Sequence, residues 1–103
     1  MKLRINIVPE AQVQIDELSA WWDANRPAAV QLADELERLF ALLLFRPHIG
    51  LLLDGSPITG VRTRRIGSTP YMLYYWPETA KGVVHVLAVW TTAFGTVPPL
   101  SRP

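Results

Sequence analysis

VRTRRIGSTPYMLYYWPETAKGVVHVLAVW, residues 61 to 90, contains three runs rich in β-branched and aromatic residues, and short polar connections separate them. The runs cover residues 61 to 66, 70 to 76 and 82 to 90. Runs of this kind are typical of strands, and connections this short suit hairpins. The stretch therefore predicts an antiparallel meander of three strands.

The residues before this stretch change from one period to another. Residues 2 to 8 alternate, with Leu3, Ile5 and Ile7 on one side, as in a half-buried strand. From Pro9 the apolar residues recur at helical spacing up to about residue 25, and a second helix is predicted to start near Pro27. Two helices joined this tightly should form an antiparallel hairpin. Their apolar stripes consist of Ala11, Ile15, Leu18 and Trp22, and of Ala29, Leu32, Leu36, Leu39 and Leu43.

The order of these elements predicts an α+β fold. A strand, a helical hairpin and a meander give a four-stranded sheet with both helices packed on one face. We expect residues 46 to 60 to form a loop, and residues 1 to 103 to form a single domain with a proline-rich tail from about residue 95.

Composition excludes several classes of protein. The chain has 103 residues, a formal net charge of +1 and no cysteine, and half of its residues are apolar. The longest apolar run, residues 39 to 45, is far shorter than the roughly 20 residues that cross a membrane. No signal-peptide core, phosphate-binding glycine loop, His-Glu metal motif or nucleophile elbow occurs. We therefore expect a cytoplasmic protein without cofactor or metal.

Charge is distributed unevenly along the chain. Residues 1 to 55 carry five cations and eight anions, whereas residues 56 to 103 carry five cations and one anion. A basic region favours an anionic partner.

Arginines and aromatic residues of the meander are candidates for contacting that partner. Alternation puts Arg62 and Arg64 on one face of their strand and Arg65 on the other. Guanidinium groups and aromatic rings can bind phosphates and stack on bases. The same pattern also fits a sheet whose tyrosines fill the core and whose arginines pair with helix carboxylates. The target-binding candidates are Arg62, Arg64, Arg65, Tyr71, Tyr75 and Trp90.

Catalytic chemistry is only weakly indicated. RNA cleavage without a metal needs a group that accepts the 2′-hydroxyl proton and a group that protonates the leaving oxygen. Arginine stabilises phosphate charge but does not shuttle protons. His85 is expected on the same strand face as Val83, Leu87 and Val89, where a structural role is favoured over that of a general base. The weak catalytic candidates are Arg62, Arg64, Arg65, Tyr75 and His85.

Several motifs, in this order and spacing, resemble the RelE/ParE superfamily of bacterial toxins. They are WWDANRPAA (21 to 29), RPHIG (46 to 50), GVRTRRI (60 to 66), PYMLYYW (70 to 76), LAVW (87 to 90) and GTVPPL (95 to 100). The resemblance implies a toxin that is neutralised by a cognate antitoxin, whose C-terminal segment wraps it. RelE-like toxins cleave messenger RNA on the ribosome, whereas ParE-like toxins poison DNA gyrase.

Three positions depart from the pattern of RelE-like ribonucleases. Met72 stands where an arginine is common, and Thr91 and Phe94 stand where a histidine and an arginine are common. We therefore expect a ParE-like toxin that inhibits gyrase by binding, rather than an enzyme. The alternatives are a RelE-like ribonuclease and a degenerate, non-toxic member that is retained as a binding partner.

The helical hairpin is the expected docking surface for the antitoxin. Trp21 and Trp22 are neighbours, and the stripe assigns Trp22 to the core and Trp21 to the margin. A marginal tryptophan can anchor an interface. The candidate antitoxin-binding residues are Trp21, Leu32 and Leu36, in a hetero-oligomer in which the antitoxin also adds a strand to a sheet edge.

Overall fold

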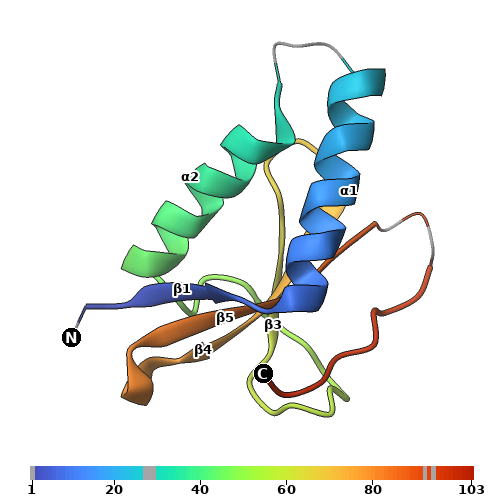
Figure 1. The fold of residues 1–103 in the computed structure, drawn as a ribbon. Coiled ribbons are helices and arrows are strands. Elements are labelled where there is room, and N and C mark those ends of the chain that lie inside the picture. The colour runs from blue at the N-terminus through green and yellow to red at the C-terminus, as the bar shows by residue number, and fades with distance from the viewer. Residues whose placement is uncertain (1, 27–29, 92, 94) are drawn as a thin grey trace.

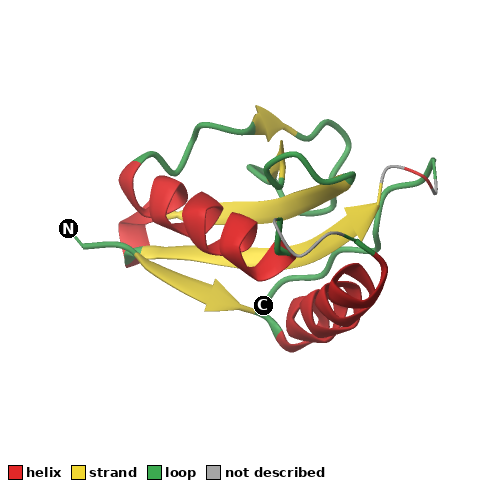
Figure 2. Cartoon of the chain, turned by 90° about the horizontal axis from the view of Figure 1, so that it is seen from above, coloured by secondary structure: helices red, strands yellow, loops and turns green. Residues whose placement is uncertain are grey.

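The computed structural model describes residues 2–26, 30–91, 93 and 95–103, and its elements form two layers (Figure 1). The elements are β1 (Arg4–Ile7), α1 (Pro9–Asn25), α2 (Leu32–Phe45), β2 (Leu51–Leu52), β3 (Arg62–Arg65), β4 (Tyr71–Glu78), the short 3-10 helix η1 (Thr79–Lys81) and β5 (Val83–Thr91). The sheet forms one layer, and α1 and α2 lie together on one of its faces (Figures 1 and 2). The predicted α+β class is confirmed.

The sheet has the strand order β1-β5-β4-β3-β2. β3, β4 and β5 form the predicted antiparallel meander, and β1 pairs in parallel with β5. The sheet has five strands rather than the predicted four, because β2 forms within the expected loop and pairs Leu51 with Thr63 and Leu52 with Arg62. A strand of two leucines shows no alternation, so its sequence contains no periodic signal.

α1 is held to the sheet by Trp22. Pro9 suits the first turn because its missing N–H has no partner at that place in a helix. The indole of Trp22 is buried, its Nε1 donates a hydrogen bond to the Val30 carbonyl oxygen (2.7 Å), and its ring meets that of Tyr71 edge-on. The predicted inward orientation of Trp22 is therefore confirmed.

α2 begins at Leu32, later than the predicted start near Pro27. Pro27 and Ala29 lie outside the described residues. The rest of the predicted stripe is confirmed, since Leu32, Leu36, Leu39 and Leu43 are all buried against the sheet.

A β-bulge changes which side chains face the helices. Tyr74 pairs with Ala88 and Tyr75 with Val86, so Leu87 is an extra residue in β5. Because a bulge shifts the alternation by one residue, Val89 joins the core whereas His85 pairs with Trp76 on the opposite face. The prediction that His85 shares a face with Leu87 and Val89 is wrong for this reason.

Residues 95–103 form no helix or strand and fold back on the domain (Figure 1). Pro98 is buried, Leu100 packs against the core, and the Arg102 guanidinium lies 5.6 Å from the ring centre of Trp76. Within the described ranges, neither α1 nor α2 is long and apolar enough to cross a bilayer.

Candidate binding groove

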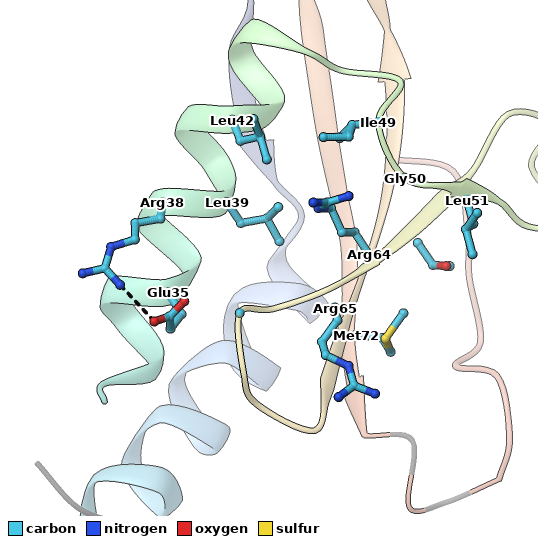
Figure 3. A pocket seen from close by; sticks show the side chains of 12 residues that line it. Glu35, Arg38, Leu39, Leu42, Ile49, Gly50, Leu51, Arg64, Arg65 and Met72 are labelled. Atoms are coloured by element: carbon cyan, nitrogen blue, oxygen red, sulfur yellow. Dashed lines mark hydrogen bonds and ion pairs between the residues drawn. The ribbon is translucent and has the colours of Figure 1, made fainter. Parts of the chain in front are cut away.

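A groove of about 600 Å³ lies between α2 and β3 (Figure 3). We call it the α2–β3 groove. Its apolar wall consists of Leu39, Leu42, Ile49, Leu51 and Met72, and its polar lining consists of Glu35, Arg38, Thr63, Arg64 and Arg65, with Gly50 and Gly67 completing it. The groove therefore combines an apolar wall with three cations and one carboxylate.

Gly50 fixes one side of the groove by bonding through both of its peptide groups. Its N–H donates to the hydroxyl oxygen of Tyr75 (2.7 Å), and its carbonyl oxygen accepts a hydrogen bond from Arg62 Nη1 (2.8 Å). The chain passes so close to Tyr75 that a Cβ on Gly50 would overlap the tyrosine hydroxyl. Only glycine fits here without a displacement, so the groove wall and the core are joined at this residue.

The arginines of β3 differ in what they contact. Arg62 is bound to the Gly50 carbonyl, so it supports the groove. Arg64 is half-buried and Arg65 is exposed, and neither has a hydrogen bond or ion pair within the described residues. Arg38 is already paired with Glu35 at 2.9 Å (Figure 3). Arg64 and Arg65 therefore keep guanidinium donors available for a partner.

Tyr71 and Tyr75 belong to the core. Both are buried. Burial raises the pKa of each phenol above its usual value, because the charged phenolate would lose its hydration. The structural alternative considered for the tyrosines applies to these two residues. Their prediction as target contacts is therefore corrected, because their side chains have almost no surface that a partner could reach.

Arg65, Met72 and Trp90 occupy one row across the sheet face that lies away from the helices. Arg65 pairs with Met72, and Met72 pairs with Trp90, so the three side chains project to the same side. Arg65 and Met72 therefore border the α2–β3 groove from the face opposite to the helices, whereas Arg64, which pairs with the core residue Leu73, borders it from the helix side. Trp90 and Thr91 are both half-buried. Phe94 lies outside the described residues.

His85 lies at another place on that face, in a cluster at β1, β4 and β5. Its Nε2 is 3.0 Å from Glu78 Oε1, its Nδ1 is 2.9 Å from Asn6 Nδ2, and its ring stacks on Trp76. With the amide nitrogen of Asn6 facing Nδ1, that atom accepts and Nε2 donates to the carboxylate. Both ring nitrogens are thus occupied, which supports the structural role over that of a general base.

Glu78 and Asn6 were not predicted as partners of His85. Asn6 stands on the polar side of the first predicted strand, but the parallel pairing of β1 with β5 carries no local sequence signal. The second strand of the meander was expected to end at Trp76, with Pro77 opening the connection, whereas β4 continues to Glu78. The hydrogen bond with His85 lowers the pKa of the Glu78 carboxyl group, and Lys81 adds to this effect.

On the helical hairpin, Trp21 is 48% exposed, whereas Leu32 and Leu36 are 0% and 3% exposed. The guanidinium of Arg26 lies 5.6 Å and 5.5 Å from the ring centres of Trp21 and Trp22. Trp21 thus has the free surface that was expected. The prediction that Leu32 and Leu36 contact the antitoxin is corrected, because both side chains are buried in the core against the sheet.

The sequence profile of the ParE toxin of type II toxin-antitoxin systems (parDE) matches residues 5–94. The chain belongs to the ParE toxin family. No curated protein sequence matches it. The predicted membership of the RelE/ParE superfamily is confirmed, and the chain is a toxin of a type II toxin-antitoxin system.

Solved structures support the same fold for this ParE-family toxin. A double arginine-to-alanine mutant of the Escherichia coli toxin RelE in the free state matches with a TM-score of 0.65 at 20% identity, over 89% of this chain and 85% of that one. The toxin-antitoxin complex RelBE2 of Mycobacterium tuberculosis contains a chain that matches with a TM-score of 0.63 at 21% identity, over 88% of this chain and 99% of that one.

Within the described residues, no three His, Asp or Glu side chains are grouped to hold a metal ion.

Proposed function

We propose that this toxin acts in the cytoplasm by binding DNA gyrase rather than by cutting messenger RNA, and that a cognate antitoxin neutralises it. ParE-like members of the superfamily poison gyrase, and the ParE family matches most of this chain. The resemblance to RelE rests on the fold, which both branches of the superfamily share.

The chemistry of the α2–β3 groove is the observation that carries this proposal. Among the residues that the structure describes, the guanidinium groups of Arg64 and Arg65 have no hydrogen-bond or ion-pair partner, and they stay charged at any physiological pH. The groove's carboxylate, on Glu35, is paired with Arg38. A group that moves protons works best with a pKa near the operating pH, and burial shifts the pKa of Tyr75 further from neutrality. The groove is therefore suited to hold an anionic surface rather than to transfer protons.

Met72 supports the same conclusion. It lines the groove at the position where RelE-like ribonucleases commonly carry an arginine. A thioether has no positive charge and donates no hydrogen bond, so it adds nothing to the stabilisation of a phosphate. It instead adds an apolar side chain to the sheet face that lies away from the helices, beside Arg65 and Trp90, and an apolar group there favours contact with a protein.

The antitoxin is expected to lie across the helical hairpin and to use Trp21 as an anchor. The RelBE2 structure is that of a toxin-antitoxin complex, and its toxin fold is similar to this one. Trp21 offers half of its surface to a partner, and the neighbouring Arg26 can donate hydrogen bonds to acidic groups.

Induction of the toxin in cells without antitoxin tests the proposed function. Growth should stop, DNA damage signalling should rise, and protein synthesis should continue during the first minutes. A halt in translation within minutes, with normal supercoiling, would favour the RelE-like ribonuclease. Normal colony counts would favour the degenerate member that has kept only its binding partner.

A further inference from the structure

β2 forms an open edge of the sheet. It pairs with β3 on one side and is the last strand in the sheet order. The Leu53 N–H donates a hydrogen bond to the Val61 carbonyl oxygen (2.8 Å). Because hydrogen-bonding directions alternate along an antiparallel strand, the N–H and carbonyl groups of Leu52 point away from β3. The main chain of β2 therefore presents one donor and one acceptor on the same residue.

The side chains of β2 are apolar and accessible. Leu51 and Leu52 are 78% and 56% exposed. Sheet edges are commonly protected from pairing by charged side chains or proline, and neither residue of β2 is of that kind. Because removing apolar surface from water is favourable, this edge gains free energy when another strand covers it.

The charges on either side of β2 differ in sign. Arg46 precedes the strand, and Arg64 lies beside Gly50 in the α2–β3 groove (Figure 3). Asp54 follows the strand and is exposed. Within the described residues, none of these three charged side chains has an ion pair. One end of the strand is therefore positive and the other is negative.

An antiparallel pair of two β2 strands brings these opposite ends together. When Leu52 pairs with Leu52 of a second copy, each N–H donates to the carbonyl oxygen of the other, and the pair has two-fold symmetry. In this register Asp54 of each copy stands opposite Gly50 of the other. Arg64 directly follows Thr63, which is the β3 partner of Leu51. Because Gly50 has no side chain, the Asp54 carboxylate of one copy can reach the Arg64 guanidinium of the other across it.

The opposite edge of the sheet lacks this complementarity. β1 and the residues next to it carry the cations Lys2 and Arg4, and none of residues 2 to 8 is acidic. A copy paired with this edge would place cations opposite cations or neutral residues, and facing like charges destabilise a strand pair. Of the two edges, β2 is therefore the one suited to self-pairing.

We propose that the free toxin forms a weak symmetric dimer through its β2 edge, in which Asp54 of each copy pairs with Arg64 of the other. The two sheets continue into one another, and the α2–β3 groove of each copy receives a carboxylate from the other. The interface is small, so the dimer dissociates on dilution. The monomer then keeps Arg64 for its target, and only this consequence rests on the proposed function.

The molar mass of the full-length toxin at different concentrations tests the dimer. Analytical ultracentrifugation should give the monomer mass at about 1 µM and approach twice that mass at about 1 mM, as expected for a small interface. A monomer mass across this whole range would overturn the proposal.

Reversal of single charges tests the pairing of Asp54 with Arg64. Asp54→Lys and Arg64→Glu should each require an at least about tenfold higher concentration for association, because each makes both contacts repulsive. An equimolar mixture of the two variants should associate like the wild type, since each contact then joins a cation to an anion. Asp23→Lys, at an exposed site on α1, is the control and should not change association. Equal association of all variants, or no recovery in the mixture, would overturn the proposal.

Amide hydrogen exchange locates the interface without a substitution, so it does not depend on the folding of any variant. The amide of Leu52 should exchange at least about threefold more slowly at high toxin concentration than at low, because it becomes hydrogen-bonded in the dimer. The amide of Ile5 on β1 is the control and should not change. Unchanged exchange at Leu52 in a sample of doubled mass would overturn the proposal. None of these measurements involves gyrase, so failure of the dimer and failure of the proposed function give different results.

Discussion

Gly50→Ala should destabilise the fold more than a glycine-to-alanine substitution at a position where the added methyl group has open space around it, such as Gly55. The Cβ of the alanine would overlap the Tyr75 hydroxyl and lie 2.6 Å from the Thr63 carbonyl oxygen. Neither atom can withdraw easily, because Tyr75 is fully buried and Thr63 belongs to β3 between two paired strands. The added methyl group must therefore displace β2 or the tyrosine ring.

The cost can be worked out from these contacts. Overpacking costs about 1–3 kcal/mol, and breaking the hydrogen bond from Gly50 N–H to Tyr75 adds about 1 kcal/mol. The sum is about 2–4 kcal/mol, and for a domain of this size each kcal/mol lowers the Tm by about 4–8 °C. The expected fall in Tm is therefore about 10–30 °C.

Thermal unfolding followed by circular dichroism, with urea titration, measures this loss. Gly55→Ala is the control, because Gly55 has φ of +73° and open space around it, so only a conformational cost of about 1 kcal/mol is expected. In the double variant Gly50→Ala/Tyr75→Phe the overlap with the hydroxyl is gone. The loss of unfolding free energy in the double variant should therefore be smaller than the sum of the losses in the two single variants. A loss for Gly50→Ala no larger than that for Gly55→Ala, or simple additivity, would refute the reasoning.

Three further predictions concern acid stability, the core and the helical hairpin. The hydrogen bond with His85 lowers the pKa of the Glu78 carboxyl group in the folded state. The ionised carboxylate therefore stabilises the fold at pH values above its usual pKa of 4.5, and this contribution is lost as the pH falls through the lower pKa of the folded state. Glu78→Gln should therefore differ in unfolding free energy from the wild type at pH 7 but much less at pH 3; a pH-independent difference would contradict this. Leu36→Ala should cost about 2–5 kcal/mol in urea titration, and a loss below about 1 kcal/mol would place Leu36 outside the core. Trp21→Ala should keep the Tm and weaken antitoxin binding in calorimetry, and an unchanged affinity would remove Trp21 from the interface.

Periodic signals predicted the large elements of this fold. The alternation of residues 2 to 8, the two helical stripes and the meander each extend over enough residues to show their period. Each of these elements forms, although α2 begins at Leu32 rather than near Pro27. The two adjacent tryptophans were also separated correctly, because neighbours on a helix cannot both face the core.

Features that depend on pairing between distant segments were not predictable in this way. The bulge at Leu87 arises from the register between β4 and β5, and it moves His85 to the face opposite Val89. β2 becomes a strand only because β3 lies beside it. The sequence places Tyr75 among several aromatic residues, but only its contact with Gly50, 25 residues away, makes it a buried support rather than a contact residue.

The candidate site could be predicted in part. The arginines of β3 were singled out from their residue type and alternation, and Arg64 and Arg65 line the groove without a hydrogen-bond or ion-pair partner in the described part of the chain. The opposite wall of the groove comes from α2 and from residues 49 to 51, and no local pattern connects those segments with β3. Arg62 could not be distinguished from Arg64 because its partner, the Gly50 carbonyl, is a main-chain group.

Supercoiling by purified DNA gyrase, titrated with the free toxin, is the most direct test of a toxin that acts by binding. Wild-type toxin should inhibit supercoiling in proportion to its concentration, and addition of the antitoxin should restore it. Arg64→Ala and Arg65→Ala should need a higher concentration for the same inhibition, because they remove free cations from the groove. Full supercoiling at every toxin concentration, with a toxin that still stops growth in cells, would contradict the account.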